Sequence, residues 1–369
     1  MTVGVTKRIH LVVGARPNFM KIAPLYHALN KAPWCEPILV HTGQHYDAAL
    51  SDAFIRDLAL PPPDHHLGIG SGTHAEQTGA AMIAYERLCA RDRPDLCVVA
   101  GDVNSTLACA LAAKKLLVKV GHLEAGLRSR DWTMPEEVNR IVTDTISDIL
   151  WTPSEDADAN LAQEGIAAER ISRVGNIMLD SYELLRPRIE AVSVAARFGF
   201  EPGGYGVVTL HRPVNVDHAE TLAGLLAALL HIAPRLPLIF PAHPRTQKAL
   251  ARSGLRERLA AASGLRIIEP LGYIEFMALV RAARLAITDS GGIQEETSYL
   301  GVPCLTLRPN TERPVTITHG TNRLVEASQI EDAVARVLAG KWPKGKPIAL
   351  WDGRTAERIV ADLSRRLFQ

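Results

Sequence analysis

Short runs of apolar residues alternate along this chain with longer stretches in which apolar residues recur every three or four positions. An uninterrupted apolar run predicts a strand buried on both faces, and the three-to-four spacing predicts a helix with one apolar face. In the first half these patterns predict strands at Ile9–Val13, Ile38–His41, Leu96–Ala100 and Val118–His122, and helices near 74–90 and 104–115. Buried strands separated by helices indicate a parallel sheet with helices on both sides.

A turn follows the first predicted strand, at residues 14–17 (Gly-Ala-Arg-Pro). A helix should begin at this turn, because a proline at the first helical position gives up only a backbone donor that has no intrahelical partner. One face of the helix is apolar and carries Ile22, Leu25, Tyr26 and Leu29. The chain therefore opens with a strand, a tight turn and an amphipathic helix.

The same alternation restarts after residues 175–204, which we interpret as a hinge and the entry to a second domain. The second set of predicted strands is Tyr205–Leu210, Leu236–Phe240, Leu265–Glu269, Leu285–Thr288 and Val302–Leu307. We therefore predict an α/β protein of two Rossmann-like, doubly wound parallel-sheet domains facing a cleft, at residues 1–175 and 176–353. No strand follows the final helix, 354–369, which makes the first domain a candidate surface for it to pack on.

Composition limits the classes of protein that this chain can be. Its 369 residues exceed a typical single-domain core, and a formal net charge of +1 gives no reason to expect nucleic acid or an anionic membrane as a partner. The most apolar stretch, 222–240, is interrupted by His231, Pro234, Arg235 and Pro237, so it does not predict a membrane span. The N-terminus lacks a signal-peptide pattern. The five cysteines lack CxxC or Cys/His ligand spacing, so we expect reduced thiols, a cytoplasmic protein and no metal.

A glycine pair follows the predicted strand Leu285–Thr288. In Asp289-Ser290-Gly291-Gly292 the glycines would let backbone N–H groups approach a phosphate, the start of the next helix would add positive potential, and Ser290 would add a hydroxyl donor. Glu296, one turn into that helix, could accept hydrogen bonds from both hydroxyls of a ribose. The alternative is an ordinary helix cap with a capping-box glutamate. The stretch by itself favours neither interpretation.

Arg16 and Lys21 lie on the first turn and on the helix that follows it. The turn lacks the GxGxxG fingerprint, so this strand gives little support for NAD binding. An arginine at the carboxyl end of a strand is well placed to bind a phosphate oxygen. The alternative is a surface charge pair, but cations at a helix start oppose the helix dipole, which favours a functional role.

Several acids stand just beyond predicted strands or on loops. For Asp102 and the pair Glu136-Glu137 there is an alternative explanation without function. Asp102 could cap the next helix, and the two glutamates could be favourable charges in a first helical turn. Glu124 lies between two apolar runs and has no such explanation. Carboxylates that converge at one edge of a sheet suggest acid/base chemistry on a weakly acidic proton.

Histidine and arginine also end two strands of the second domain. His211-Arg212 follows the strand Tyr205–Leu210, and His243 follows Leu236–Phe240 with Arg245 two residues on. A lone histidine is usually a packing residue, but two such pairs in one domain suit an anionic ligand.

The motifs together resemble those of the non-hydrolysing UDP-N-acetylglucosamine 2-epimerases. They occur in the order of that family and span residues 14 to about 325: Gly14–Pro17 with Lys21–Pro24, Gly101-Asp102, Gly121–Arg128, Met134–Arg140, Thr209–Arg212, Asp289–Glu296 and Thr311–Pro314. The resemblance implies the two-domain fold shared with many nucleotide-sugar glycosyltransferases (GT-B type), and a homodimer.

The resemblance also implies roles for individual residues. Ser290, Gly291 and Gly292 would contact the phosphates, Glu296 the ribose, and Phe276 would lie near the uracil. Arg16, Lys21, His211 and Arg313 are expected around the diphosphate and reacting sugar, with His211 counted among the catalytic residues. The catalytic acids would be Asp102, Glu124 and Glu136.

The implied reaction is the reversible conversion of UDP-N-acetylglucosamine to UDP-N-acetylmannosamine, without a cofactor. Loss of UDP from C1 would acidify the C2 proton and give a 2-acetamidoglucal, and UDP would then add back with the proton delivered to the other face. Two faces require more than one acid/base group. The alternatives are a hydrolysing 2-epimerase, a 2-epimerase of another UDP-2-acetamido sugar, and a GT-B glycosyltransferase. A role in making polysaccharide or glycan precursors is expected from the resemblance alone.

Two positions depart from the family pattern. Tyr46 and Pro213 stand where many members carry arginine, after Gln44-His45 and His211-Arg212. In bacterial relatives the residues matching Gln44, Arg212 and His243 help to bind a second UDP-N-acetylglucosamine as an activator. We therefore expect activation by substrate to be altered or absent in this chain.

Overall fold

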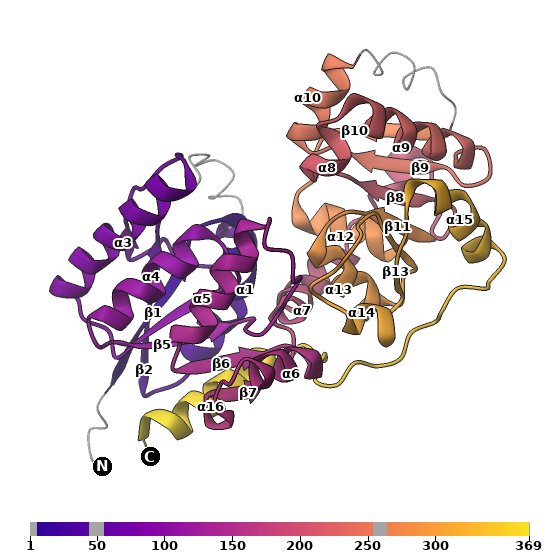
Figure 1. The fold of residues 1–369 in the computed structure, drawn as a ribbon. Coiled ribbons are helices and arrows are strands. Elements are labelled where there is room, and N and C mark those ends of the chain that lie inside the picture. The colour runs from indigo at the N-terminus through magenta and orange to yellow at the C-terminus, as the bar shows by residue number, and fades with distance from the viewer. Residues whose placement is uncertain (1–5, 44–54, 254–263, 369) are drawn as a thin grey trace. The chain divides into compact units, whose positions relative to one another are not determined.

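The computed structural model describes residues 6–43, 55–253 and 264–368. Within these residues the chain forms two compact units. The first, unit 1, contains residues up to Leu185 together with Ala349 onwards, and the second, unit 2, runs from Arg186 to Ile348. Each unit is built on one parallel sheet flanked by helices (Figure 1), so the predicted α/β class is confirmed.

Unit 1 contains a seven-stranded sheet in which every neighbouring pair is parallel. In spatial order its strands are β3 (His65–His66), β2 (Cys35–His41), β1 (Lys7–Val13), β4 (Leu96–Ala100), β5 (Lys119–Leu123), β6 (Ile149–Thr152) and β7 (Ile171–Arg173). The chain builds outward from β1 to β3 and then returns beside β1 as β4. The strand order therefore reverses between β1 and β4, and ligands of open α/β sheets bind at such a point, beyond the carboxyl ends of the strands.

Helices cover both faces of this sheet because its strands are apolar on both sides. They are α1 (Arg16–Leu29), α3 (His74–Arg91), α4 (Asn104–Lys115), α5 (Pro135–Ile146), α6 (Glu155–Gln163), α7 (Ile177–Glu190) and α16 (Thr355–Phe368), with a 3-10 turn η1 (Ala168–Arg170). Val40, Tyr85 and Val99 belong to one buried cluster that joins strands to α3 and α4. This packing fixes the strand ends from which the candidate residues project.

The division between the units falls between Leu185 and Arg186, within α7, and not at residue 175 as we predicted. The first half of α7 is tied to unit 1 by two buried side chains. Asp180 accepts hydrogen bonds from the backbone N–H groups of Thr355 (3.1 Å) and Ala356 (2.8 Å), and the Ser181 hydroxyl donates to the carbonyl of Met20. These contacts also assign α16 to unit 1.

Unit 2 contains a six-stranded parallel sheet. Its strands, in spatial order, are β10 (Leu265–Ile268), β9 (Leu238–Pro241), β8 (Gly206–Thr209), β11 (Leu285–Thr288), β12 (Cys304–Thr306) and β13 (Asn322–Leu324). Here the strand order reverses between β8 and β11. The two sheets therefore present the same kind of ligand site, each within its own unit.

The helices of unit 2 pack on both faces of its sheet (Figure 1). They are α8 (Pro213–Val216), α9 (Ala219–Ile232), α10 (Pro244–Arg252), α12 (Tyr273–Arg281), α13 (Gly291–Leu300), α14 (Val315–Thr318) and α15 (Ile330–Leu338), with 3-10 turns η2 (Ala195–Phe198) and η3 (Ala327–Gln329). Leu222, Leu225 and Leu229 of α9 lie in the main buried cluster of the unit. Within the described ranges, no helix is both long enough and apolar enough to cross a bilayer.

Candidate active site

Glu124 lies directly after β5, near the strand-order reversal of unit 1, and its backbone is strained. Its φ angle is +73°, in the left-handed region that a non-glycine residue adopts only at a cost of about 1–3 kcal/mol. The backbone N–H groups of Glu124 and Ala125 both donate to the carbonyl of Trp151 at 3.1 Å, which holds this conformation. Such strain occurs at functional sites, where it orients a side chain.

The carboxylate of Glu124 is buried and only half satisfied. Its Oε2 is paired with the ammonium group of Lys21 from α1, whereas its Oε1 has no hydrogen-bond partner within the described part of the chain. Gly101, after β4, leaves room for Lys21, because a Cβ there would lie 2.7 Å from Lys21 Nζ. An acceptor oxygen that is buried without a partner is available to take a proton from a ligand.

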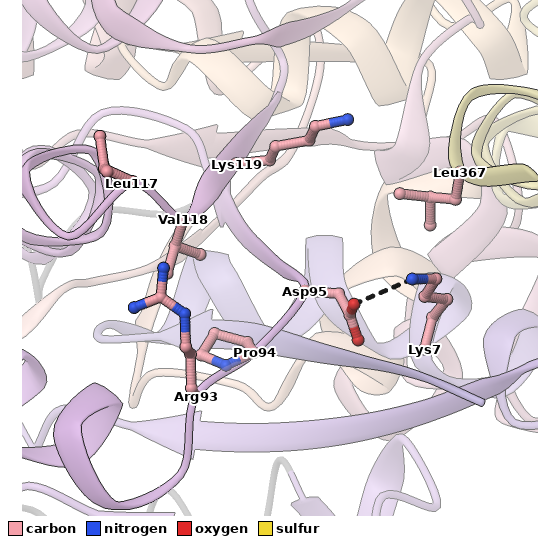
Figure 2. Close-up of a pocket in the computed structure, with 8 residues that line it drawn as sticks. All are labelled: Lys7, Arg93, Pro94, Asp95, Leu117, Val118, Lys119 and Leu367. Carbon is pink, nitrogen blue, oxygen red and sulfur yellow. Dashed lines mark hydrogen bonds and ion pairs between the residues drawn. The ribbon is translucent and has the colours of Figure 1, made fainter. Parts of the chain in front are cut away.

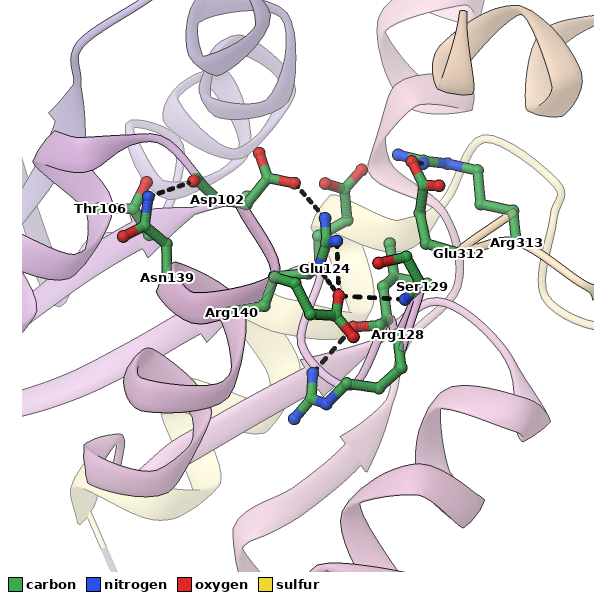
Figure 3. A network of polar contacts seen from close by, with 12 residues as sticks. Asp102, Thr106, Glu124, Arg128, Ser129, Asn139, Arg140, Glu312 and Arg313 are labelled. Carbon is green, nitrogen blue, oxygen red and sulfur yellow. Dashed lines mark hydrogen bonds and ion pairs between the residues drawn. The ribbon is translucent and has the colours of Figure 1, made fainter. Parts of the chain in front are cut away.

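A second carboxylate, Asp102, follows Gly101 in the chain and is bound by a buried arginine (Figure 3). Arg140 Nη1 lies 2.5 Å from Asp102 Oδ2, and Arg140 Nη2 lies 2.7 Å from Glu137 Oε2. Asn139 donates to the backbone carbonyl of Asp102 at 2.8 Å. Since α5 supplies Glu137, Asn139 and Arg140, this helix fixes the position of Asp102.

The two neighbouring glutamates at the start of α5 have different environments. Glu137 is fully buried and accepts hydrogen bonds from the backbone N–H groups of Ser129 (3.0 Å) and Arg130 (2.7 Å). Burial disfavours its ionisation, but these bonds and the Arg140 guanidinium outweigh burial and hold the pKa of Glu137 below its usual value. Glu136 is exposed. Glu137 is therefore a structural anion, and Glu136 is the one that solvent or a ligand can reach.

Two residues before Glu124, the buried side chain of His122 has partners at both ring nitrogens. Nδ1 lies 2.6 Å from Asp144 Oδ1, and Nε2 lies 2.8 Å from the carbonyl oxygen of Gly101, which can only accept. Arg128 Nη1 lies 2.7 Å from the other Asp144 oxygen. Burial opposes ionisation of Asp144, yet His122 and Arg128 outweigh it and lower the pKa of Asp144. These contacts of His122, Asp144 and Arg128 join the loop that carries Asp102 to the loop that carries Glu124.

In unit 2 the start of α13 has the form of an anion cradle. Ser290 is its N-cap residue, and Gly291 and Gly292 form its first turn. A Cβ on Gly291 would lie 2.6 Å from Arg313 Nη1, so the guanidinium lies directly against the helix start. Arg313 also pairs with Glu295 at 2.9 Å and with Glu312 at 2.5 Å. Backbone donors, the helix dipole and a cation thus meet at one place.

Glu296 lies one turn further along α13 and is buried. The hydroxyl of Tyr273, on α12, donates to Glu296 Oε1 at 2.7 Å. Burial raises the pKa of Glu296 to about 8, partly offset by the Tyr273 bond and reinforced by the charge of Glu295. Phe276 is half-buried on α12, one turn after Tyr273.

His211 lies after β8 and contacts a buried carboxylate from the neighbouring strand. Its Nδ1 is 3.0 Å from Asp289 Oδ1, and the His243 ring lies against it with centroids 5.5 Å apart. Asp289 also accepts the backbone N–H of Arg212 at 2.9 Å. Burial works against ionisation of Asp289, but His211 and these donors prevail and lower its pKa. These residues all lie at the carboxyl edge of the unit 2 sheet.

Comparison with known proteins identifies the family. The family model described as UDP-N-acetylglucosamine 2-epimerase matches residues 27–364. UDP-N-acetylglucosamine 2-epimerase of Methanocaldococcus jannaschii is 41% identical over 367 residues, covering 97% of this chain and 99% of the relative. This chain belongs to the UDP-N-acetylglucosamine 2-epimerase family. The resemblance that we inferred from the motifs is therefore confirmed.

A solved structure and a second relative extend the comparison. The crystal structure of the Methanocaldococcus jannaschii enzyme in complex with UDP-GlcNAc and UDP matches with a TM-score of 0.88, again covering 97% of this chain and 99% of that one. A Pseudomonas aeruginosa relative, UDP-2,3-diacetamido-2,3-dideoxy-D-glucuronate 2-epimerase, is 38% identical over 365 residues, which cover 97% of this chain and 99% of that protein. The fold is thus that of the family, and the family contains more than one sugar specificity.

Not every predicted site residue of this family member can be located. Arg16 begins α1, but its side chain lies outside the described part of the structure, as does all of Gln44. Lys21, which we expect near the diphosphate and the reacting sugar, pairs with Glu124. Sequence reasoning gave no role to Asp289 and Tyr273, which are partners of the predicted residues His211 and Glu296. Within the described residues, no group of His, Cys, Asp and Glu side chains has the arrangement of a metal site.

A pocket of about 370 Å³ lies at the amino ends of the strands of the unit 1 sheet, opposite the carboxyl ends that carry the candidate site residues of this unit (Figure 2). It is lined by Lys7 and Lys119, the first residues of β1 and β5, and by Asp95, just before β4. Lys7 is paired with Asp95 at 3.0 Å. Since ligands of this fold class bind at the carboxyl ends of the strands, we assign the pocket no part in catalysis.

The raised pKa of Glu296 gives a prediction for the ligand-free protein. Glu296 binds its proton more tightly when the chain is folded, so between its usual value of 4.5 and about 8 the folded state holds more protons. The free energy of unfolding should therefore fall as pH rises through this window, by up to about 5 kcal/mol. Glu296→Gln should remove this loss, so the melting temperatures of variant and wild type should agree near pH 5 and diverge by pH 9, with the variant higher.

The control for this prediction is Glu275→Gln, on α12. Glu275 has 38% of its side chain exposed and pairs with Arg197. This variant should follow the wild-type pH dependence throughout. If the melting temperatures of wild type and Glu296→Gln change with pH in the same way from pH 5 to pH 9, Glu296 does not titrate in this window.

Proposed function

We propose that this chain is a 2-epimerase that interconverts UDP-N-acetylglucosamine and UDP-N-acetylmannosamine without hydrolysing them. The observation that carries the proposal is Glu124, a buried carboxylate on a strained backbone with one unpartnered oxygen. It occurs in a chain of the UDP-N-acetylglucosamine 2-epimerase family. A binding protein without catalytic activity would have no need for such a group, because it costs folding free energy.

The reaction follows from the chemistry of the sugar. The C2–H bond has no neighbouring carbonyl, so a base can remove this proton only while the C1–O bond to UDP is breaking. The C2–H electron pair becomes the C1=C2 bond, the C1–O pair leaves with the diphosphate, and the base keeps the proton. Addition of UDP to the resulting 2-acetamidoglucal, with a proton delivered to the other face of C2, completes the epimerisation.

The residues divide between the two halves of this reaction. For proton transfer at C2 we propose Glu124, with Asp102 and Glu136 as the further carboxylates that a second face requires. For the departing diphosphate we propose the start of α13 (Ser290, Gly291 and Gly292) with Arg313 and His211, because donors and cations stabilise the developing negative charge. A bound diphosphate that these groups retain can add back, which favours the non-hydrolysing outcome over release of UDP.

Further parts of the proposal follow the family resemblance. Glu296 binds the ribose, and Phe276 lies against the uracil. Arg16 and Lys21 assist at the reacting sugar and diphosphate. The enzyme needs no cofactor or metal, acts as a homodimer in the cytoplasm, and shows altered activation by substrate through Gln44, Arg212 and His243.

A second substrate deserves a test because of one relative. The Pseudomonas aeruginosa protein named for UDP-2,3-diacetamido-2,3-dideoxy-D-glucuronate is 38% identical, close to the 41% of the Methanocaldococcus jannaschii enzyme. The two sugars share the 2-acetamido group and differ at C3 and C6. Each should therefore be offered to the enzyme as substrate.

Proton NMR in deuterium oxide tests the proposal directly. Purified enzyme with UDP-N-acetylglucosamine, and with no added nicotinamide or metal, should give a second UDP-sugar anomeric signal and deuterium at C2 of both epimers. Free N-acetylmannosamine and UDP would make the enzyme hydrolytic. If UDP-N-acetylglucosamine does not change and the UDP-linked diacetamido glucuronate is turned over, the enzyme is a 2-epimerase of the latter sugar. No turnover of either would overturn the proposal.

A further inference from the structure

A buried carboxylate in unit 2, Asp289, has no role in the function proposed so far. It is fully buried and lies in the chain directly before the N-cap of α13. Its oxygens accept the backbone N–H groups of His211 (3.0 Å) and Arg212 (2.9 Å) and the side-chain amide of Asn215 (3.1 Å). It therefore joins the loop after β8 to the loop after β11, the two strands between which the order of the sheet reverses.

The same carboxylate also approaches the ring of His211. Asp289 Oδ1 lies 3.0 Å from His211 Nδ1. A carboxylate has only lone pairs to offer, so this approach is favourable only when Nδ1 carries a proton. In neutral His211 the proton is then on Nδ1, and Nε2 is the nitrogen free to exchange a proton with a ligand.

Strand register places this histidine beside the anion cradle. In the β8–β11 pair Thr209 is aligned with Thr288. His211 and Ser290 each follow their strand by two residues, so the imidazole and the start of α13 occupy matching positions on adjacent loops. Asp289 precedes Ser290 in the chain and accepts hydrogen bonds from the loop that carries His211.

From this geometry we propose that Asp289 is a positioning residue that fixes the tautomer and orientation of His211, so that Nε2 serves the leaving diphosphate. The inference rests on the proposed function. When the diphosphate binds, Nε2 takes up a proton from solvent, so that His211 is doubly protonated. As the C1–O bond breaks, its electron pair passes to the β-phosphate oxygen, and the Nε2–H donates a hydrogen bond to that oxygen. The Nδ1 proton remains with His211 throughout, and the Asp289 carboxylate offsets the positive charge of the doubly protonated ring. When UDP adds back, this oxygen forms the C1–O bond again and its hydrogen bond with Nε2–H is broken.

The tautomer of His211 in the wild-type protein is the first test. Nitrogen-15 NMR of the ligand-free enzyme, with the His211 signal assigned by its loss in His211→Gln, should show neutral His211 protonated on Nδ1. Protonation on Nε2 instead would overturn the proposal. This measurement needs no substrate, so it can fail while the epimerase proposal stands, and it can succeed even if UDP-N-acetylglucosamine is not turned over.

A double-mutant cycle separates positioning from structural support. Asp289→Asn should lower kcat by about 10²-fold, with less than a threefold change in KM, because a wrongly placed histidine affects the transition state more than substrate binding. In a His211→Gln background, the same substitution should change kcat by less than threefold, because there is no imidazole left to orient. An undiminished loss of kcat in that background would show that Asp289 supports the fold alone, and would overturn the proposal.

Asn215→Ala is the matched control. Asn215 donates to the same carboxylate, and also to the carbonyl of Leu307 at 3.1 Å. The variant therefore disturbs the surroundings of Asp289 but keeps the approach to His211. It should lower the melting temperature and leave kcat within threefold of wild type. A loss of kcat equal to that of Asp289→Asn would count against a specific role of the Asp289–His211 contact.

Discussion

Glu124→Gln is expected to lower kcat for epimerisation by about 10²–10⁴-fold, the usual contribution of a positioned acid/base group. Glutamine keeps the size of the side chain but cannot take a proton. The unpartnered Oε1 of Glu124 is the atom that would lose this ability. The rate should be measured by NMR from each epimer separately, together with uptake of deuterium at C2, because exchange without epimerisation would show that Glu124 serves one face of the sugar.

The control for this prediction is Glu164→Gln. Glu164 also pairs with a basic residue, Arg128, but has 32% of its side chain exposed and has no place in the proposed chemistry. It should retain wild-type kcat. If Glu124→Gln keeps more than a third of wild-type kcat, Glu124 does not move the C2 proton, and Asp102 and Glu136 become the candidates.

Most of the fold follows from the apolar pattern because most strands are uninterrupted apolar runs buried on both faces. The strands that we missed are β3, β6, β7 and β13, each of four residues or fewer. The sequence of β6, Ile149–Thr152, does contain an apolar run that we did not assign. Asn322–Leu324 (β13) contains one apolar residue and becomes a strand by pairing with β12, where Asn322 accepts from the Thr306 hydroxyl at 2.6 Å. His65–His66 (β3) is a two-residue edge strand beside β2. Pairing of this kind depends on tertiary contacts that no local pattern contains.

The candidate site was predictable to the level of strand ends, and no further. Parallel strands bring their carboxyl ends together, so polar residues placed after them are found near one another. Which side chains pair cannot be read from spacing, since Lys21 and Glu124 are 103 positions apart. Burial could not be predicted from the sequence either. Glu136 and Glu137 are adjacent, yet Glu136 is exposed and Glu137 is fully buried with donors from three residues. These differences in pairing and burial depend on tertiary contacts between residues that are far apart in the sequence.

Lys21→Met is expected to destabilise unit 1 by about 3–5 kcal/mol, as when one partner of a buried ion pair is removed. The Lys21 side chain is 9% exposed and that of Glu124 is 3% exposed. Methionine fills a similar volume but leaves the Glu124 carboxylate buried without a cation. The melting temperature of the affected calorimetric transition should fall by roughly 10 °C, from about 2–4 °C per kcal/mol for a domain of this size.

The double variant Lys21→Met/Glu124→Gln makes this prediction specific. With the carboxylate neutralised no buried charge is left unpaired, so the double variant should recover most of the stability that Lys21→Met loses. Lys114→Met is the matched surface control, because Lys114 pairs with Asp148 while 42% exposed and should lose about 1 kcal/mol or less. A double variant less stable than Lys21→Met would show that the lysine stabilises unit 1 through packing of its aliphatic chain. In that case the charge of Glu124 would be tolerated without a partner, and its role as a base would not depend on Lys21.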